Sequence, residues 1–303
     1  MTMKRSTFSP QGNWYKGNTH THTTVSDGRT PPAELAAIYR NAGYHFLALT
    51  DHDVYGIHNE LNTDDFLVLP GVELAYAIPG EKGFRQHHIV GLGIPGENRY
   101  AHGQRVDYPR DIPPQQLVDM LHDNGNLAIY AHPYWSHTRM EALGGLRGLL
   151  GMEIYNNACE VGSGCGYSVD YYNQLLWDGG RLFCFASDDS HQHAKDYCGG
   201  FIVVKAPALT HNDIIDAIRA GSFYASNGPE LLDFYEEDGI VHIKCSPCRT
   251  ISLQTDICPG YAAHAQEGDL THAEFHLPEG AGYVRVYCED THGHIAWSNP
   301  ICF

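Results

Sequence analysis

The chain has 303 residues, of which 43% are hydrophobic and 18% charged, a composition ordinary for a globular protein with a sizeable core. Its formal net charge is −17, from 19 lysines and arginines against 36 aspartates and glutamates. Because a field of that sign repels phosphate backbones and anionic lipid, we expect neither a nucleic-acid polymer nor a membrane as a partner. The sequence has no apolar signal region or membrane span, and its nine cysteines make an odd count for a disulfide framework. We therefore predict a cytoplasmic protein with mostly free thiols.

Short apolar runs typical of β-strands alternate with amphipathic helical patterns over about the first 225 residues. The runs lie at 14–18, 46–50, 66–74, 88–92, 127–131, 152–155, 182–186 and 201–204, and the helical patterns at 31–41, 114–123, 169–177 and 212–220. Thr30 before two prolines indicates a helix start, and glycines at 43, 125, 179 and 221 follow the helix ends. This alternation predicts an α/β fold with a parallel sheet and outer helices, open or closed into a barrel.

The pattern changes after Gly228 and Pro229. Six short alternating runs follow, separated by turn sequences, at 231–235, 240–245, 251–255, 273–276, 283–288 and 295–298. We therefore predict two domains, residues 1–228 and a small antiparallel β module at 229–303. Cys245 and Cys248 in this module form a C-x-x-C pair that could be half of a zinc site, with Cys258 the only near neighbour in sequence; the pair alone is a weak signal.

Metal-competent side chains border nearly every apolar run of the first domain. They are His20, His22, His52, Glu73, His88, His132, Glu153, Asp189 and His191. In α/β barrels the carboxyl ends of the strands converge on one face, where catalytic groups lie. The H-x-H and D-x-H pairs put two side chains on the same face of an extended backbone, so one strand end can supply two ligands. Histidine is also abundant, at 20 residues, and imidazole is the commonest metal ligand.

Each candidate also has an ordinary explanation when it is taken alone. His88 could be a core histidine, and Asp27 could serve the turn that it forms with Ser26 and Gly28. Glu73 is harder to explain in this way, because an unpaired carboxylate at a buried strand end is costly. Chance explains poorly why such candidates border seven of the apolar runs, so the sequence predicts one polynuclear metal site.

The same motifs resemble the PHP (polymerase and histidinol phosphatase) superfamily over residues 14 to 225. They are His20-Thr-His22 with Asp27, Thr50-Asp51-His52, Gly71-Val72-Glu73, His88 before Gly91, Ala131-His132-Pro133, and Ser187 to His191. The whole chain, including residues 221–225 and 296–300, looks like the CehA/McbA-type branch, which joins a PHP domain to a small β module. The resemblance implies a distorted (β/α)7 barrel.

The resemblance also implies how the ligands divide among the ions. His20, His22, Glu73 and Asp189 would bind one ion, and Glu73 would bridge to a second ion held by His88 and His132. Asp27, His52 and His191 would hold a third, although many family members have histidine in place of Asp27. His87 and Asp188 leave a one-residue ambiguity at two ligands, and the motif favours His88 and Asp189.

Mixed histidine and carboxylate ligands suit zinc, manganese or iron, two or three ions per chain. We expect a phosphoesterase acting on a small phosphomonoester or phosphodiester, in which a metal-bridging hydroxide attacks phosphorus. Hydrolysis of a carboxylic ester or carbamate at the same site is the alternative, and a non-catalytic binding protein is a second one. Arg29, Arg85 and Arg139 lie in loops near ligands and are candidates to bind an anionic substrate, although a solvated loop arginine explains each equally well. The sequence does not indicate the natural substrate, the general acid or the oligomeric state.

Overall fold

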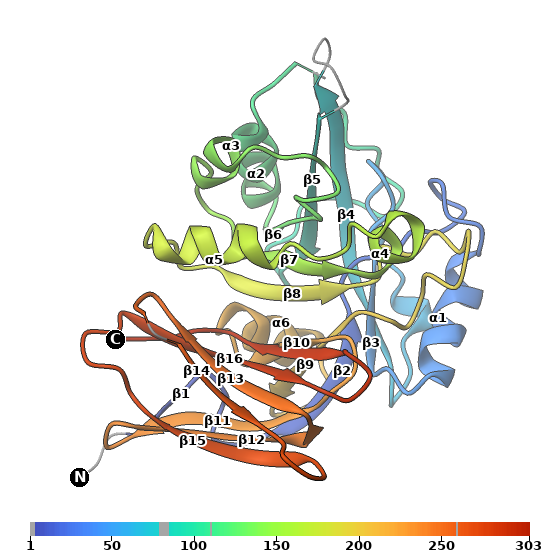
Figure 1. The fold of residues 1–303 in the computed structure, drawn as a ribbon. Helices are drawn as coiled ribbons and strands as arrows, with labels where there is room; N and C mark the ends of the chain where they lie inside the picture. The colour runs from blue at the N-terminus through green and yellow to red at the C-terminus, as the bar shows by residue number, and fades with distance from the viewer. Residues whose placement is uncertain (1–3, 79–84, 110, 259) are drawn as a thin grey trace.

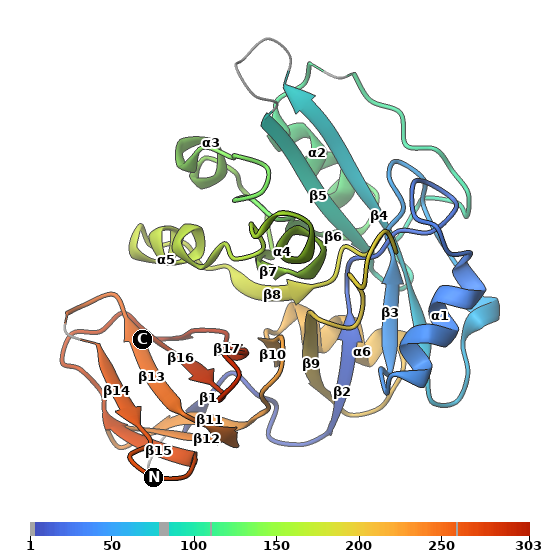
Figure 2. The same ribbon diagram turned by 45° about the vertical axis from the view of Figure 1, so that its right-hand side comes forward.

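The computed structural model describes residues 4–78, 85–109, 111–258 and 260–303. A first part rich in helices and strands lies beside a C-terminal part whose described residues form strands but no helix (Figure 1, Figure 2). In chain order the first part contains β2 (Asn13–Asn18), α1 (Pro32–Asn41), β3 (Phe46–Leu49), the 3-10 turn η1 (Asn59–Leu61), β4 (Leu67–Ile78), β5 (Arg85–Gly93), α2 (Pro114–Asp123), β6 (Asn126–Tyr130), α3 (Met140–Gly144), β7 (Gly151–Asn156), α4 (Asn157–Ser163), α5 (Val169–Trp177), β8 (Phe183–Ser187), β9 (Phe201–Ala206), α6 (His211–Arg219) and β10 (Phe223–Ser226). Every run and helical pattern expected in this part coincides with one of these elements to within a few residues.

The elements that the sequence did not predict here are η1, α3, α4 and β10. The two unpredicted helices have five and seven residues, too few for an amphipathic period to show. Helix α4 starts directly after β7, where the Asn156 side chain accepts a hydrogen bond from the Cys159 amide at 3.0 Å. Helix α1 begins one residue later than expected, because Pro31 rather than Thr30 occupies its N-cap position.

The sheet of the first part has the strand order β10-β9-β2-β3-β4-β5-β6-β7-β8. Four neighbouring pairs are parallel, namely β2/β3, β3/β4, β6/β7 and β7/β8. The other four are antiparallel, so the sheet is mixed rather than parallel as predicted. Between β4 and β5 the reason is the connection, residues 79–84, which is shorter than the dozen or more residues that a parallel crossover needs.

This hydrogen-bonded order is open, with β10 and β8 at its two ends, and the barrel stays a prediction. The side chain of Asn299 bridges these two strands. Its Oδ1 accepts a hydrogen bond from the Cys184 amide of β8 at 2.9 Å, and its Nδ2 donates to the carbonyls of Gly221 and Phe223 at 3.1 and 3.0 Å. An asparagine from the C-terminal end of the chain thus ties the two sheet ends together.

The C-terminal part has two layers of antiparallel strands. One sheet has the order β1-β11-β12-β15, and the other, β14-β13-β16-β17, continues the sheet of the first part because β17 pairs with β10. Strand β18 adds to β16. The bounds are β1 (Arg5–Ser6), β11 (Leu231–Glu237), β12 (Ile240–Cys248), β13 (Thr250–Thr255), β14 (Tyr261–His264), β15 (Leu270–His276), β16 (Tyr283–Glu289), β17 (Ile295–Ser298) and β18 (Ile301–Cys302).

The antiparallel pairing expected for this part is observed, and β1, β14 and β18 are additional strands of two to four residues. A hydrophobic cluster combines Leu35 and Tyr39 of α1 with Phe234 and Val284 of the C-terminal strands. Since the sheet and this cluster both cross residue 228, the division into two domains there stays a prediction. No helix in the described ranges is long and apolar enough to cross a membrane.

Candidate metal centre

His20 and His22 follow β2 and are both fully buried. Thr21 between them points the other way, because its hydroxyl donates to the Ala48 carbonyl at 2.8 Å. The two imidazoles meet, with 3.2 Å between their Nε2 atoms. The alternation expected of an H-x-H pair is therefore realised.

Glu73 and His88 lie inside strands rather than at strand ends. Strand β4 continues to Ile78 beyond Glu73, and β5 begins at Arg85, before His88. The two strands pair as an antiparallel ribbon with Ala75 opposite His88, which brings His88 Nδ1 to 2.8 Å from Glu73 Oε1. Our expectation that Glu73 ends a strand and His88 opens one was wrong, because the hairpin extends both strands past the cluster.

Glu73 is the centre of the arrangement, fully buried and close to five histidines. The nitrogens that approach its two oxygens are His88 Nδ1 at 2.8 Å, His52 Nδ1 at 3.0 Å, His22 Nε2 at 3.2 Å, His20 Nε2 at 3.3 Å and His132 Nε2 at 3.5 Å. Asp189 approaches three of the same rings, His22, His20 and His132, at 3.0, 3.3 and 3.4 Å. Asp27, more exposed, lies 3.4 Å from His191 and 3.6 Å from His52.

Eight of the nine candidate ligands fall into overlapping groups whose ligand atoms lie close enough to share a metal ion. The groups are His20, His22, Glu73 and Asp189; His22, Asp27, His52 and His191; and His52, Glu73 and His88. The first equals the set that the resemblance implies for one ion, and the second contains the set implied for the third ion. His132 approaches Glu73 and Asp189 from the other side.

The arrangement of imidazole nitrogens and carboxylate oxygens in this cluster suits bound metal cations. His20 Nδ1 lies 2.7 Å from Glu153 Oε1, so a ring that binds a metal ion would donate its one proton there and present the Nε2 lone pair toward His22, Glu73 and Asp189. Acceptor atoms that face one another in this way need positive charge between them. His52 Nδ1 and Glu73 Oε2 are buried and lie 3.0 Å apart, but neither makes a hydrogen bond with a described residue.

Polar partners behind the cluster fix the orientation of its rings. Glu153 Oε1 accepts from His20 and from the Ser187 hydroxyl, and Oε2 accepts from the His132 amide at 3.0 Å. His132 Nδ1 lies 2.9 Å from the Ser136 hydroxyl, and His191 Nδ1 donates to a backbone carbonyl at 2.8 Å. Such partners select the tautomer that presents the inward nitrogen to a metal.

Replacing Glu153 with glutamine is expected to weaken metal affinity and turnover about 10- to 100-fold while the chain stays folded. The amide offers one oxygen, so its NH₂ group must face either His20 Nδ1–H or the His132 amide, which are both donors. Metal titration of the purified variant checks this result. Exposed Glu34→Gln is the control, and unchanged affinity in Glu153→Gln would contradict an orienting role.

Three further buried carboxylates hold the loops that carry the ligands. Asp51 accepts from the Thr23 amide at 2.8 Å and from the Ser26 hydroxyl at 2.7 Å, next to Asp27. Asp196 accepts from the amides of residues 191 and 192, and Asp188 accepts from Asn18, Tyr39 and the amides of residues 198–200. No sequence pattern indicated this role for Asp51 or Asp196.

Side-chain direction separates the two pairs of neighbouring candidates, and which of them bind a metal ion stays a prediction. His87 shares a hydrogen bond with the Tyr130 hydroxyl at 2.6 Å, on the other side of the sheet from Glu73, whereas His88 faces Glu73. Asp188 faces the amides of 198–200, whereas Asp189 faces the histidines. His132 and Asp189 have φ of 29° and 52°, a backbone region that is unfavourable for such residues and is often found at functional sites.

The histidines and carboxylates shift one another's protonation. Burial opposes charge on His20, but Asp189, Glu73 and Glu153 outweigh it and hold the pKa of His20 well above its usual value. The pKa of His132 is raised in the same way. Although burial acts against it, His20 and its neighbours hold the pKa values of Glu73 and Asp189 below their usual range. Protons therefore compete with metal ions for this cluster.

A cavity of about 420 Å³ opens above the cluster. Five ligand candidates form its floor, and the rest of its lining is Gln86, Trp135, Ala158, Cys159, Val161, Gly162, His193, Ala194 and Asp196. Trp135 stands edge-on to His132, with ring centroids 5.1 Å apart. No lysine or arginine lines this cavity within the described ranges. Arg29 and Arg139 are exposed outside it, and the side chain of Arg85 lies outside the described residues, so the substrate role of all three stays a prediction.

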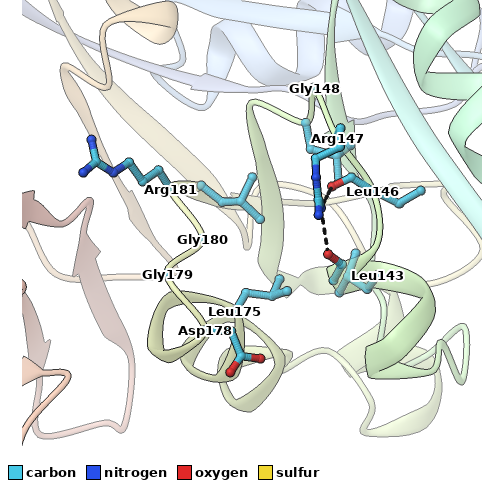
Figure 3. Close-up of a pocket in the computed structure, with 12 residues that line it drawn as sticks. Leu143, Leu146, Arg147, Gly148, Leu175, Asp178, Gly179, Gly180 and Arg181 are labelled. Atoms are coloured by element: carbon cyan, nitrogen blue, oxygen red, sulfur yellow. Dashed lines mark hydrogen bonds between the residues drawn. The ribbon is translucent and has the colours of Figure 1, made fainter.

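Another cavity, of about 410 Å³, lies between α3 and the end of α5 and is lined by none of the ligand candidates (Figure 3). Leucines line much of it, and the Arg147 Nη1 atom donates to the carbonyls of Gly144 and Leu146 at 2.9 and 3.0 Å. Arg147 and Arg181 extend in different directions (Figure 3). With neither histidine nor cysteine among its lining residues, this cavity offers no comparable chemistry.

Comparison with known structures relates the fold to PHP-like proteins. The chain is similar to a two-domain protein from Bacteroides vulgatus described as containing a predicted PHP-like metal-dependent phosphoesterase, with a TM-score of 0.53, 15% identity and coverage of 95% of both chains. At this identity the likeness shows a common fold, and its coverage includes the C-terminal part. The CehA/McbA-type branch within this fold stays a prediction.

Other similarities are weaker. A putative metal-dependent phosphoesterase from Bifidobacterium adolescentis matches with a TM-score of 0.43 and 16% identity, over 67% of this chain and 94% of that one. An amidohydrolase from Chromobacterium violaceum matches with a TM-score of 0.40 and 17% identity, over 58% of this chain and 87% of that one. An uncharacterized protein from Methanocaldococcus jannaschii is 30% identical over 127 residues, which span 38% of this chain and 56% of that relative. No protein-family model matches the sequence.

Proposed function

We propose that this chain is a metal-dependent phosphoesterase that hydrolyses a small phosphomonoester or phosphodiester. The observation that carries the proposal is the position of Glu73, whose carboxylate belongs to two of the ligand groups and also lies near His132. One carboxylate shared in this way suits two or three divalent ions a few ångströms apart. Clusters of that kind activate water and neutralise charge on the attacking and leaving oxygens of phosphoryl transfer.

The residues of the chain supply position and orientation. His20, His22, Glu73 and Asp189 would hold one ion, Glu73, His88 and His132 a second, and Asp27, His52 and His191 a third. Glu153 and Ser136 keep the rings of His20 and His132 turned inward. The apolar wall of the cavity, formed by Trp135, Val161 and their neighbours, removes water from around a bound substrate.

Metal analysis and a substrate panel test this proposal together. We expect two or three zinc, manganese or iron ions per chain after purification, and hydrolysis of p-nitrophenyl phosphate or bis-p-nitrophenyl phosphate. Fewer than one ion per chain would favour the non-catalytic binding protein instead. Activity on p-nitrophenyl acetate with none on either phosphate would reject phosphoester hydrolysis.

A carboxylic ester or carbamate hydrolase is the second candidate, and the cavity lining favours it. The described part of that lining has apolar side chains and no lysine or arginine, so an anionic phosphate would find its positive charge in the metal ions alone. A neutral ester needs no such charge beyond polarisation of its carbonyl. The panel above distinguishes the two hydrolases.

Trp135→Ala is expected to raise the KM for p-nitrophenyl substrates about 10-fold, with a smaller change in kcat. Trp135 is 36% exposed and lines the cavity beside His132, so its ring is available to pack against an aryl group. Steady-state kinetics with aryl and methyl esters of the same acid check this result. An equal effect on both esters would contradict a packing role, and Trp177→Ala, an exposed residue at the end of α5, is the matched control.

A further inference from the structure

Arg285 is a fully buried cation remote from the metal centre. It lies in β16, and its exposed fraction is 0%. Its guanidinium is 5.2 Å from the centre of the Tyr172 ring, and its Nη2 donates to Asn173 Oδ1 at 2.5 Å. Both partners belong to α5, so Arg285 sits where the C-terminal strands pack against the first part of the chain.

Most of the hydrogen-bonding capacity of this guanidinium is unused. Its Nε and Nη1 atoms are buried and have no acceptor within the described ranges. These two nitrogens carry three of the five N–H donors of an arginine. No carboxylate among the described residues lies within ion-pair distance of Arg285 either. A buried charge without a partner is strongly unfavourable, so this guanidinium needs an acceptor that the described residues do not supply.

A polar atom on the neighbouring strand is also without a partner, although it lacks a donor and not an acceptor. Gln254 stands directly opposite Arg285 across β13 and β16, and its buried Oε1 has no hydrogen-bond donor in the described part of the chain. A water molecule can bridge such atoms, but it leaves the positive charge of Arg285 unbalanced. A bound anion satisfies the donors and balances the charge.

We propose that a small monovalent inorganic anion of the chloride class binds to Arg285 between β16 and α5. Its ligands are the N–H groups on Nε and Nη1, which no other atom of the described residues accepts. Full burial of the guanidinium favours a single-atom anion over a larger oxyanion. Because Asn173 and Tyr172 flank the same guanidinium, the anion stabilises the contact between the C-terminal strands and α5.

Bromide tests the position directly, since it replaces chloride and scatters anomalously. Crystals of the full chain grown in sodium bromide are expected to show an anomalous peak within hydrogen-bonding distance of the Arg285 guanidinium. An ordered water there, with no anomalous signal, would overturn the proposal. This measurement uses the wild-type chain and does not depend on any variant folding.

Thermal unfolding tests the energetic role. With gluconate keeping the ionic strength constant, raising chloride from about 1 to 100 mM is expected to raise the wild-type Tm by about 3 °C or more. Arg285→Gln should lose this response, and Arg181→Gln, an exposed arginine, should keep it. An equal chloride response in the wild type and Arg285→Gln would contradict the proposal.

Asn173→Asp provides a second variant that keeps the arginine. The Asn173 Oδ1 atom already accepts from Arg285, so aspartate puts a permanent negative charge beside the guanidinium. We expect a higher Tm at low chloride and a reduced chloride response. A variant that responds to chloride as fully as the wild type would place the anion elsewhere.

Discussion

Glu73→Gln is expected to lower the hydrolysis of the preferred p-nitrophenyl ester at least about 10³-fold, because metal clusters of this kind contribute several kcal/mol to the barrier. Glu73 is the carboxylate that two of the ligand groups share, and its oxygens approach five imidazoles at 2.8 to 3.5 Å. The amide keeps the shape of the side chain but has one oxygen and no charge. It therefore cannot bridge two ions, and we expect the number of bound ions per chain to fall by at least one.

The substitution also removes a charge that is buried among histidines, so folding must be measured beside activity. Circular dichroism and Tm should show a folded chain, since the glutamine fills the same volume. Exposed Glu34→Gln on α1 is the matched control and should keep full activity and metal content. If Glu73→Gln retained wild-type metal content and more than a tenth of the activity, Glu73 would not be a bridging ligand.

The sequence predicted the strands of this chain well, and it picked out candidate ligands that the structure brings together, because both depend on local patterns. Apolar runs and helical periods mark β2 to β9 and the long helices. The H-x-H spacing placed His20 and His22 on one face, and Thr21 indeed turns away from them. The structure then brings all nine candidate ligands to one cluster, from segments up to about 170 residues apart.

Features that depend on long-range pairing could not be predicted in this way. The apolar run that ends at Leu74 does not show that β4 continues to Ile78, because the extension is stabilised by its pairing with β5. Asp51 and Asp196 hold ligand loops through backbone amides, and an aspartate in a loop has no sequence signature for such a role. The bridge that Asn299 makes between β8 and β10 could not be predicted either, since its partners are over 70 residues away.

Cysteine spacing gives another case in which sequence neighbours were a poor guide. Cys258, the thiol nearest to Cys245 and Cys248 in sequence, is exposed, whereas Cys288 on β16 is buried in the same hydrophobic cluster as that pair. The packing of the two sheets, and not distance along the chain, determines which thiol shares the cluster with this pair. The zinc site at the C-x-x-C pair stays untested, since the structure records all nine cysteines simply as free thiols.

Removing the metal ions with a chelator is expected to lower the Tm by about 6 °C or more at pH 8.5. A site held at 1,000 times its Kd contributes about 4 kcal/mol to the folded state, and each kcal/mol corresponds to about 1.6 °C for a chain of 303 residues. Differential scanning calorimetry of loaded and chelated protein measures the difference. Chelated Glu73→Gln should differ far less from its loaded form, because it binds fewer ions.

The Tm difference between loaded and chelated protein should also grow with pH. The direction of this change follows from the pKa values of the histidines. In the chain without ions, five of them, His20, His22, His52, His132 and His191, have raised pKa values. A histidine whose pKa is higher in the folded chain stabilises it fully below the unfolded pKa of about 6.5 and loses this contribution as the pH rises through the folded pKa. His88, whose pKa is lowered, is already neutral above pH 7 and does not contribute to this change.

The chelated protein is therefore expected to lose stability between pH 7 and 8.5. Metal ions need the same nitrogens deprotonated, so the affinity of the loaded protein rises over that range. The two Tm curves should diverge as the pH increases, with other titrating groups cancelling in the difference. Parallel curves would mean that protons and ions do not compete for these histidines, and the cluster would then owe its stability to hydrogen bonds and not to metal.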